Sequence, residues 1–151
     1  MGKATDVLII GVGNPMRGDD AAGPLVAGLL AARGFETLVL DADGTHLIDA
    51  FAGREAVTIV DATQAGGEPG RIRRFEGDRM PLQSGLFHYS SHAFGVAEAI
   101  ETARALDMLP RRLVVYGIEA ADFTAGATPS AAVAAAVDAV AERIAKETRA
   151  G

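Results

Sequence analysis

The sequence predicts a three-layer α/β/α sandwich, in which helices cover both faces of a mostly parallel, twisted sheet of about five strands. Short aliphatic runs alternate with segments of helical periodicity through most of the chain. The first run, Val7 to Gly11, is continuously apolar, as strands buried on both faces are. No repeat or long linker divides the 151 residues, so one domain over residues 1–151 is expected.

A helix is expected after this first strand, reaching about Arg33. Leu25 and Leu29 lie four residues apart, which places them on one helix face. Proline is tolerated only in the first turn of a helix, where Pro24 would lie, and Gly34 is a suitable stop.

The other elements follow from the same periodicities. Further strands are predicted at residues 37–40, 56–60, 71–75 and 113–116. Further helices are predicted at residues 47–51, 92–106 and 130–146. Residues 64–70 and 81–91 are expected to be loops. The strand at 71–75 alternates roughly and carries Arg71, Arg73 and Arg74, as a charged edge strand does.

Composition excludes several classes of function. The net charge of −6 argues against nucleic acid or an anionic membrane as the main partner. The absence of cysteine excludes disulfides, thiolate metal sites and a cysteine nucleophile. No signal-peptide core and no apolar run of about 20 residues is present, so a cytoplasmic protein is expected.

The turn after the first strand, GVGNPMRGDD, invites comparison with a dinucleotide-binding loop. Gly11 and Gly13 fit that fingerprint, but Met16 stands where the third glycine belongs. Asp19 and Asp20 would lie near the pyrophosphate and repel it. The loop therefore favours a cation over an anion.

Aspartates lie at or just beyond the ends of the first three strands: Asp20, Asp41 and Asp61. Ligands of open α/β sheets bind at the carboxyl ends of strands, where the strand order reverses. If the first strand lies between the second and third, Asp20 and Asp61 share a cleft. The neighbouring Asp19 is expected to cap the helix.

The chain has three histidines, His46, His88 and His92. His92 is predicted to open a helix, where the helix dipole favours the neutral imidazole that binds metal. Asp20, Asp61 and His92 are therefore a plausible three-ligand set for a borderline divalent metal, with coordination positions left open.

Several motifs together resemble one family, the endopeptidases that mature the large subunit of nickel–iron hydrogenases. They are, in order, GVGNPMRGDDAAG, DADGTH, TIVDAT, SSHAFGV and YGIEAADFTAGATPSAAV. They cover nearly the whole chain in the family's order, and the resemblance implies a phosphorylase/hydrolase-like fold.

The resemblance implies which residues contact nickel and act in catalysis. The second residue of the acidic pair is Asp20, which is glutamate in some members, and the aspartate ending the third strand is Asp61. The histidine before the hydrophobic–glycine turn is His92. The DGT of DADGT corresponds to the family's DGGT-like turn, and its departures leave Asp41 and Asp43 as secondary candidates.

The implied function is one proteolytic cut. Such a protein removes the carboxyl-terminal extension of a nickel-loaded large-subunit precursor, its expected partner. A monomer is expected, although the sequence does not establish the oligomeric state. The substrate supplies the nickel, so no permanently bound cofactor is expected, and either nickel or a carboxylate could activate the attacking water. Loops such as 64–70 and 77–91 would set specificity.

Two alternatives remain open at the level of sequence. A non-catalytic nickel chaperone or metal sensor could use the same three side chains, although such proteins usually carry more soft or imidazole ligands. A phosphorylase-like or nucleotide-binding protein needs basic residues at the cleft, whereas the predicted loops here are mainly acidic.

Overall fold

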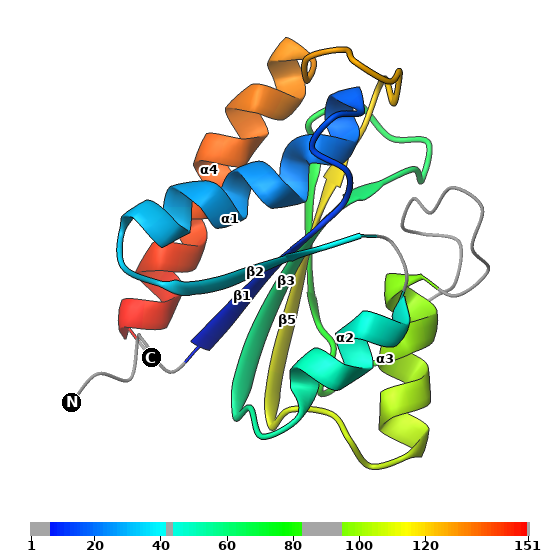
Figure 1. Cartoon of the computed structure of the whole chain (residues 1–151), viewed down its shortest axis with the longest axis vertical. Coiled ribbons are helices and arrows are strands. Elements are labelled where there is room, and N and C mark those ends of the chain that lie inside the picture. The colour runs from blue at the N-terminus through cyan, green and yellow to red at the C-terminus, as the bar shows by residue number, and fades with distance from the viewer. Residues whose placement is uncertain (1–6, 42–43, 83–94, 151) are drawn as a thin grey trace.

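The computed structural model describes residues 7–41, 44–82 and 95–150 and has the expected three layers (Figure 1). In chain order the elements are β1 (Val7–Val12), the 3-10 helix η2 (Gly18–Ala21), α1 (Ala22–Ala32), β2 (Glu36–Leu40), α2 (Gly44–Phe51), β3 (Ala56–Thr63), β4 (Ile72–Glu76), α3 (Val96–Ala105), β5 (Arg112–Glu119) and α4 (Ala131–Ala150). The predicted fold class is confirmed.

The five strands form one sheet in the order β2-β1-β3-β5-β4. All neighbours are parallel except β4 and β5, which pair antiparallel. The first strand therefore lies between the second and third, as the cleft hypothesis requires. The strand order reverses between β1 and β3, and their carboxyl ends flank the switch point.

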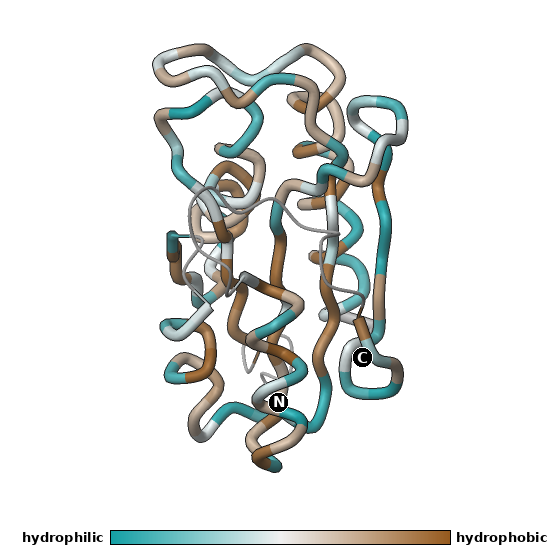
Figure 2. The backbone as a smooth tube through the Cα atoms, turned by 90° about the vertical axis from the view of Figure 1, so that its right-hand side faces the viewer, coloured by the Kyte–Doolittle hydropathy of each residue, from teal (hydrophilic) through white to brown (hydrophobic). Residues whose placement is uncertain are grey.

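Helices α1 and α4 cover one face of the sheet, and α2 and α3 cover the other (Figure 1). Each face has its own hydrophobic core, because successive side chains of a strand point to opposite faces. Ile9 packs into the core under α1 and α4, and Ile10 packs into the core under α2 and α3. Figure 2 shows hydrophobic residues running along the strands, with hydrophilic ones concentrated in the connections.

Two predicted strand ends are wrong. Strand β3 continues past Asp61 to Thr63, and β5 continues past Gly117 to Glu119. The two extensions pair with each other, Asp61 opposite Gly117 and Thr63 opposite Glu119, so the glycine does not end its strand. The pairing of β3 with β1 ends at Val60, opposite Gly11 and one residue before Asp61.

Helix α1 lies unusually close to the sheet, because glycines form the contact. A Cβ added to Gly11 would overlap the carbonyl oxygen of Gly23. A Cβ added to Gly23 would overlap the carbonyl oxygens of Val60 and Val12. The first turn of α1 therefore lies backbone to backbone on β1 and β3.

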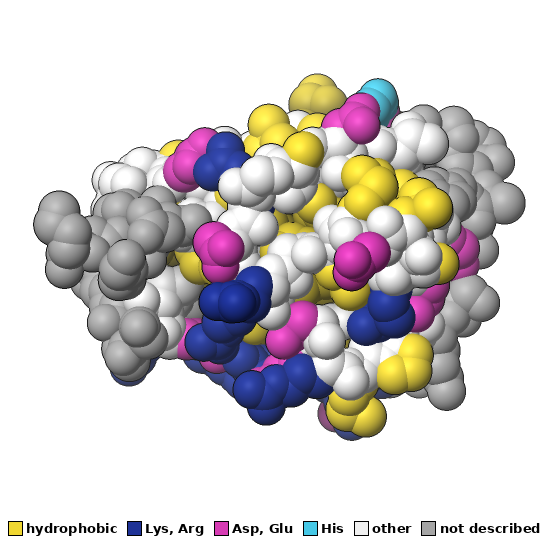
Figure 3. Space-filling model, turned by 90° about the horizontal axis from the view of Figure 1, so that it is seen from below, with side chains coloured by type: hydrophobic (Ala, Val, Ile, Leu, Met, Phe, Trp, Pro, Cys, Tyr) yellow, Lys and Arg dark blue, Asp and Glu magenta, His cyan; other side chains and the backbone are white. Residues whose placement is uncertain are grey.

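Among the described residues no helix is both long and apolar enough to cross a membrane. The face seen from below in Figure 3, where β3 and β5 begin, carries acidic and basic side chains close to one another.

Substituting Gly23 with alanine is expected to lower the free energy of unfolding by about 1–3 kcal/mol, because the added methyl group forces α1 away from the sheet. Gly28 is the matched control, since it lies in the same helix with open space around its Cα. Gly28→Ala is expected to raise stability by about 0.5–1 kcal/mol. Urea denaturation of both variants checks this, and equal effects would contradict the close contact.

Candidate metal-binding site at the strand switch point

Asp20 is placed by the 3-10 helix η2, which follows the turn after β1. Its side chain is buried, and its Oδ2 accepts a hydrogen bond of 2.8 Å from the backbone amide of Asn14. A Cβ at Gly13 would overlap the Asp20 carbonyl oxygen and lie 3.1 Å from its Oδ1. Gly13 also has a φ of 139°, so glycine is required for the chain to pass beneath this carboxylate.

Asp61 lies on β3 just beyond the last residue paired with β1, and only 1% of its surface is exposed. Its Oδ1 accepts a hydrogen bond of 2.8 Å from the Ala62 amide. Its buried Oδ2 has no hydrogen-bond partner among the described residues. One oxygen of this carboxylate is thus available to a ligand from outside that part of the chain.

The two carboxylates interact electrostatically. Burial raises the pKa of the Asp61 carboxyl well above its ordinary value, and the negative charge of Asp20 raises it further. The hydrogen bond from Ala62 opposes both effects without cancelling them. A cation bound between the carboxylates would offset both the burial and the repulsion, because its positive charge stabilises the ionised forms.

The structure brings together two of the three predicted ligands. His92, the third, lies outside the described residues, as does His88. Within the part of the chain that the structure describes, no group of three side chains of the metal-binding types is close enough to hold an ion. The role of His92 therefore stays a prediction.

The secondary candidates do not join the described pair. Asp41 is largely exposed, and its Oδ1 lies 3.5 Å from Nδ1 of His46, itself exposed. Asp43 lies outside the described residues. The Asp41–His46 pair is a solvated surface contact, whereas Asp20 and Asp61 are buried.

The predicted role of Asp19 as the cap of the following helix is wrong. Helix α1 has no side-chain cap. The Asp19 carboxylate instead accepts hydrogen bonds from the amides of Ala121 and Asp122, and from the amide and hydroxyl of Ser130, all within 3.0 Å. Fully buried, it fixes η2 to the loop after β5 and to the amino end of α4.

Backbone contacts reinforce this connection between the two loops. The amides of Gly18 and Asp19 donate to the carbonyls of Ala127 and Asp122, at 3.0 and 2.7 Å. The amide of Gly126 donates to the Met16 carbonyl at 2.7 Å. The turn that carries Asp20 is therefore fixed by hydrogen bonds to residues 122–127, which follow β5.

Glu119 is a buried carboxylate that the sequence analysis missed. It accepts hydrogen bonds from the Thr63 hydroxyl at 2.7 Å, the Arg73 guanidinium at 2.8 Å, and the amides of Ala65 and Gly66 at 3.0 Å. Burial raises its pKa, but these donors outweigh burial and hold the pKa below its ordinary value. Its signal was present in the sequence as an acidic residue at the end of an apolar strand.

The arginines of β4 are the edge-strand residues that the sequence predicts, but they are not a free basic surface. Arg73 pairs with Glu119, and Arg74 pairs with Glu147 and Glu76 at 2.9 and 3.2 Å. Arg74 also lies 6.0 Å from the centre of the Tyr116 ring. Because carboxylates of the chain engage both, they do not form a groove for a phosphate backbone.

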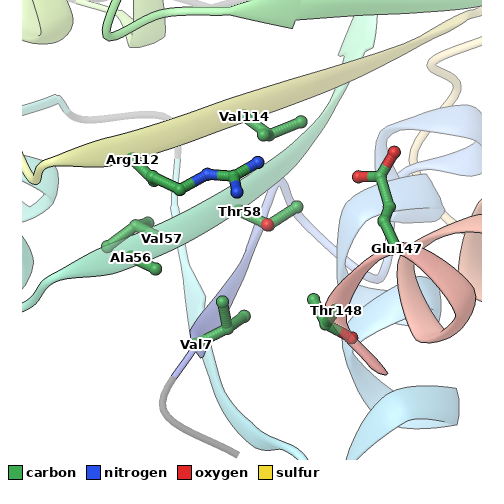
Figure 4. A pocket seen from close by; sticks show the side chains of 8 residues that line it. All are labelled: Val7, Ala56, Val57, Thr58, Arg112, Val114, Glu147 and Thr148. Carbon is green, nitrogen blue, oxygen red and sulfur yellow. The ribbon is translucent and has the colours of Figure 1, made fainter. Parts of the chain in front are cut away.

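A cavity of about 140 Å³ lies at the opposite end of the sheet (Figure 4). Its lining includes the first residues of three strands, Val7, Ala56 and Arg112, together with Thr58 and Glu147. It is therefore separated by the length of the strands from the Asp20–Asp61 pair and takes no part in that site.

The fold and the site together define a class: an open α/β protein whose strand switch point carries a buried pair of carboxylates in place of a phosphate-binding loop. The sequence profile described as hydrogenase maturation protease (HycI) matches residues 26–147. The chain belongs to the hydrogenase maturation protease family.

Individual relatives agree with this assignment. The chain is 29% identical to the hydrogenase expression/formation protein HupD of Rhodobacter capsulatus, over 98% of this chain and 73% of that protein. It is 45% identical over 80 residues to the hydrogenase 3 maturation protease of Escherichia coli, covering 49% of this chain and 50% of that protein.

A solved structure also matches over nearly the full length of both chains. The [NiFe] hydrogenase maturation protease HybD from Thermococcus kodakarensis aligns with a TM-score of 0.74 and 28% identity, over 94% of this chain and 98% of that one. Against three other curated relatives, two named HupD and one HupM, the chain spans only 54 to 63% of their length.

Replacing Glu119 with glutamine is expected to lower the free energy of unfolding at neutral pH by about 3 kcal/mol, because it leaves Arg73 without its buried partner. The folded pKa of Glu119 is lowered, so its contribution is complete above its unfolded pKa and is lost as pH falls through the folded value. The difference between wild type and Glu119→Gln should therefore shrink in acid, as measured by urea denaturation across pH.

The control for this prediction is Glu142→Gln, which removes an exposed ion pair with Arg33 and should change stability little at any pH. A wild-type advantage over Glu119→Gln that stays constant into acid would contradict the role assigned to the ionised carboxylate.

Proposed function

We propose that the chain is an endopeptidase that removes the carboxyl-terminal extension of a nickel-loaded hydrogenase large-subunit precursor. Membership in the hydrogenase maturation protease family supports the reaction class. The observation that carries the proposal at the level of residues is the buried, mutually repelling pair Asp20 and Asp61 at the strand switch point. Such a pair is suited to a cation delivered by another molecule.

The donor set fits nickel as part of the substrate. Asp61 presents a buried oxygen without a hydrogen bond from the described residues. The Asn14 amide donates a hydrogen bond to Oδ2 of Asp20 and so orients that side chain. Two carboxylates and the imidazole of His92 would be borderline-to-hard ligands, which leave coordination positions for the precursor's own ligands. Asp20, Asp61 and His92 are therefore proposed as the nickel-contacting residues.

The chain's residues would do three things in the reaction. Asp20, fixed by η2 and by Asp19, would orient the nickel-bearing segment of the precursor. Asp61, adjacent to that segment, would accept a proton from the attacking water and return it to the leaving amine. Nickel, when bound, supplies a Lewis acid near the scissile bond.

Asp61→Asn tests the proposal most directly. Loss of the carboxylate is expected to reduce cleavage by about 100-fold or more, because general acid–base catalysis contributes about that much. The folded pKa of Asp61 is raised, so its ionisation costs stability as pH rises past the unfolded value, and the variant should be at least as stable as wild type at neutral pH. Appearance of the shortened large subunit on a gel, with nickel-loaded precursor, measures the rate.

Two matched controls accompany this test. Asp49→Asn changes an exposed aspartate of α2, and His46→Ala removes an exposed histidine, so both should cleave at the wild-type rate. His92→Ala should lose activity as Asp61→Asn does, and full cleavage by it would remove His92 from the mechanism. Tight nickel binding by the wild-type protein, with no cleavage of the precursor, would favour a nickel chaperone or sensor. The monomeric state and cytoplasmic location stay predictions.

A further inference from the structure

The two outer strands of the sheet differ in how they are protected. Strand β4 carries Arg73, Arg74 and Glu76, and charged residues on an edge discourage pairing with another chain. Strand β2 has the sequence ETLVL, in which only the first residue is charged, and Glu36 is engaged by Arg54. Among the described strands, only β1 pairs with β2, so its outer side presents main-chain N–H and C=O groups.

Both faces of β2 are open at its centre. Val39 lies opposite Gly11 and shares the α1 face, and Leu38 lies opposite Ile10 and shares the α2 face. Val39 is 48% exposed and Leu38 is 38% exposed. A further strand added beside β2 would cover both side chains at once, whereas a helix packed on one face would cover only one.

Helix α1 also carries exposed aliphatic side chains. Leu25 and Leu29 lie four residues apart on one face of the helix, and they are 42% and 41% exposed. Helix α1 packs against β2 as well as β1, and Figure 1 shows β2 running in front of the other strands beside α1. These leucines lie on the flank of α1 away from β2, so we call Leu38 and Val39 alone the β2-edge surface.

The β2-edge surface leads to the candidate site. The carbonyl of Leu40, the last residue of β2, accepts a hydrogen bond of 2.9 Å from Gly13, over which Asp20 lies. Neighbouring strands lie about 4.8 Å apart, so a strand added to β2 would lie about 10 Å from β1. Asp61 lies on β3, one strand further, so about four to five extended residues beyond the end of the added strand would span the roughly 14 Å to both carboxylates.

We propose that an extended segment of the precursor protein pairs with β2 as an additional strand and is guided along this edge to the Asp20–Asp61 pair. The proposal rests on the proposed function, whose substrate is a polypeptide. Main-chain pairing supplies affinity without a particular sequence, and the aliphatic side chains of the β2-edge surface supply apolar contacts. A second copy of the chain is a poorer occupant, because it would bring together two molecules of net charge −6.

Val39→Lys and Leu38→Lys test the docking surface, since each places a charge on it at a position exposed enough to keep the fold. With nickel-loaded precursor, each is expected to raise KM by about tenfold or more while kcat at saturation stays near wild type. Met80→Lys is the matched control, because Met80 is 64% exposed and lines a groove of about 570 Å³ beside the opposite edge strand, β4. It should leave KM unchanged.

A direct binding measurement distinguishes failure of the docking surface on β2 from failure of the proposed protease function. Titration of labelled nickel-loaded precursor with wild-type protein and with Val39→Lys should show tight binding only for wild type, whether or not cleavage occurs. Cleavage by wild type and by Val39→Lys with equal KM would overturn the docking surface and leave the function intact. A rise in KM for Met80→Lys alone would assign docking to β4. A concentration-dependent dimer that Val39→Lys dissociates, with KM unchanged, would assign β2 to self-association instead.

Discussion

The backbone contact between α1 and the sheet is the constraint on which the site depends. Because Gly11 and Gly23 lack side chains, the first turn of α1 lies directly on β1 and β3. The chain passes from β1 to α1 through a turn and the 3-10 helix η2. The turn folds back so that Asp20 lies over Gly13, beside the point where β3 emerges from its pairing with β1. A side chain at Gly23 would push α1, and with it η2 and Asp20, away from Asp61 on β3.

The buried carboxylates divide into two kinds. Asp19 and Glu119 are surrounded by donors, so their burial stabilises the loops that supply those donors. Asp61 has one donor and a negative neighbour in Asp20, so its ionised form is held at a cost in free energy. Unfavourable burial of this kind is typical of residues kept for binding or chemistry, since stability alone would remove them.

The sequence predicts those parts of the fold that depend on the local spacing of apolar residues. Apolar runs and helical spacing identify the layers, and the carboxyl-end rule places Asp20 and Asp61 together once the strand order is known. The role of Asp19 was not predictable, because its partners Ala121 and Ser130 lie more than 100 residues away in the sequence. The extension of β5 past Gly117 also depends on distant partners, since that glycine pairs with Asp61 of β3 on one side and with Arg73 of β4 on the other.

The loops at the rim of the site are tethered through their main chains. Glu119 binds the amides of Ala65 and Gly66, and Asp19 binds those of Ala121 and Asp122, so the side chains of these segments take no part in the tether. Every residue except proline offers the same N–H group. The tether therefore tolerates different side chains along the rim, except where the backbone itself favours glycine, as at Gly66 with a φ of 85°.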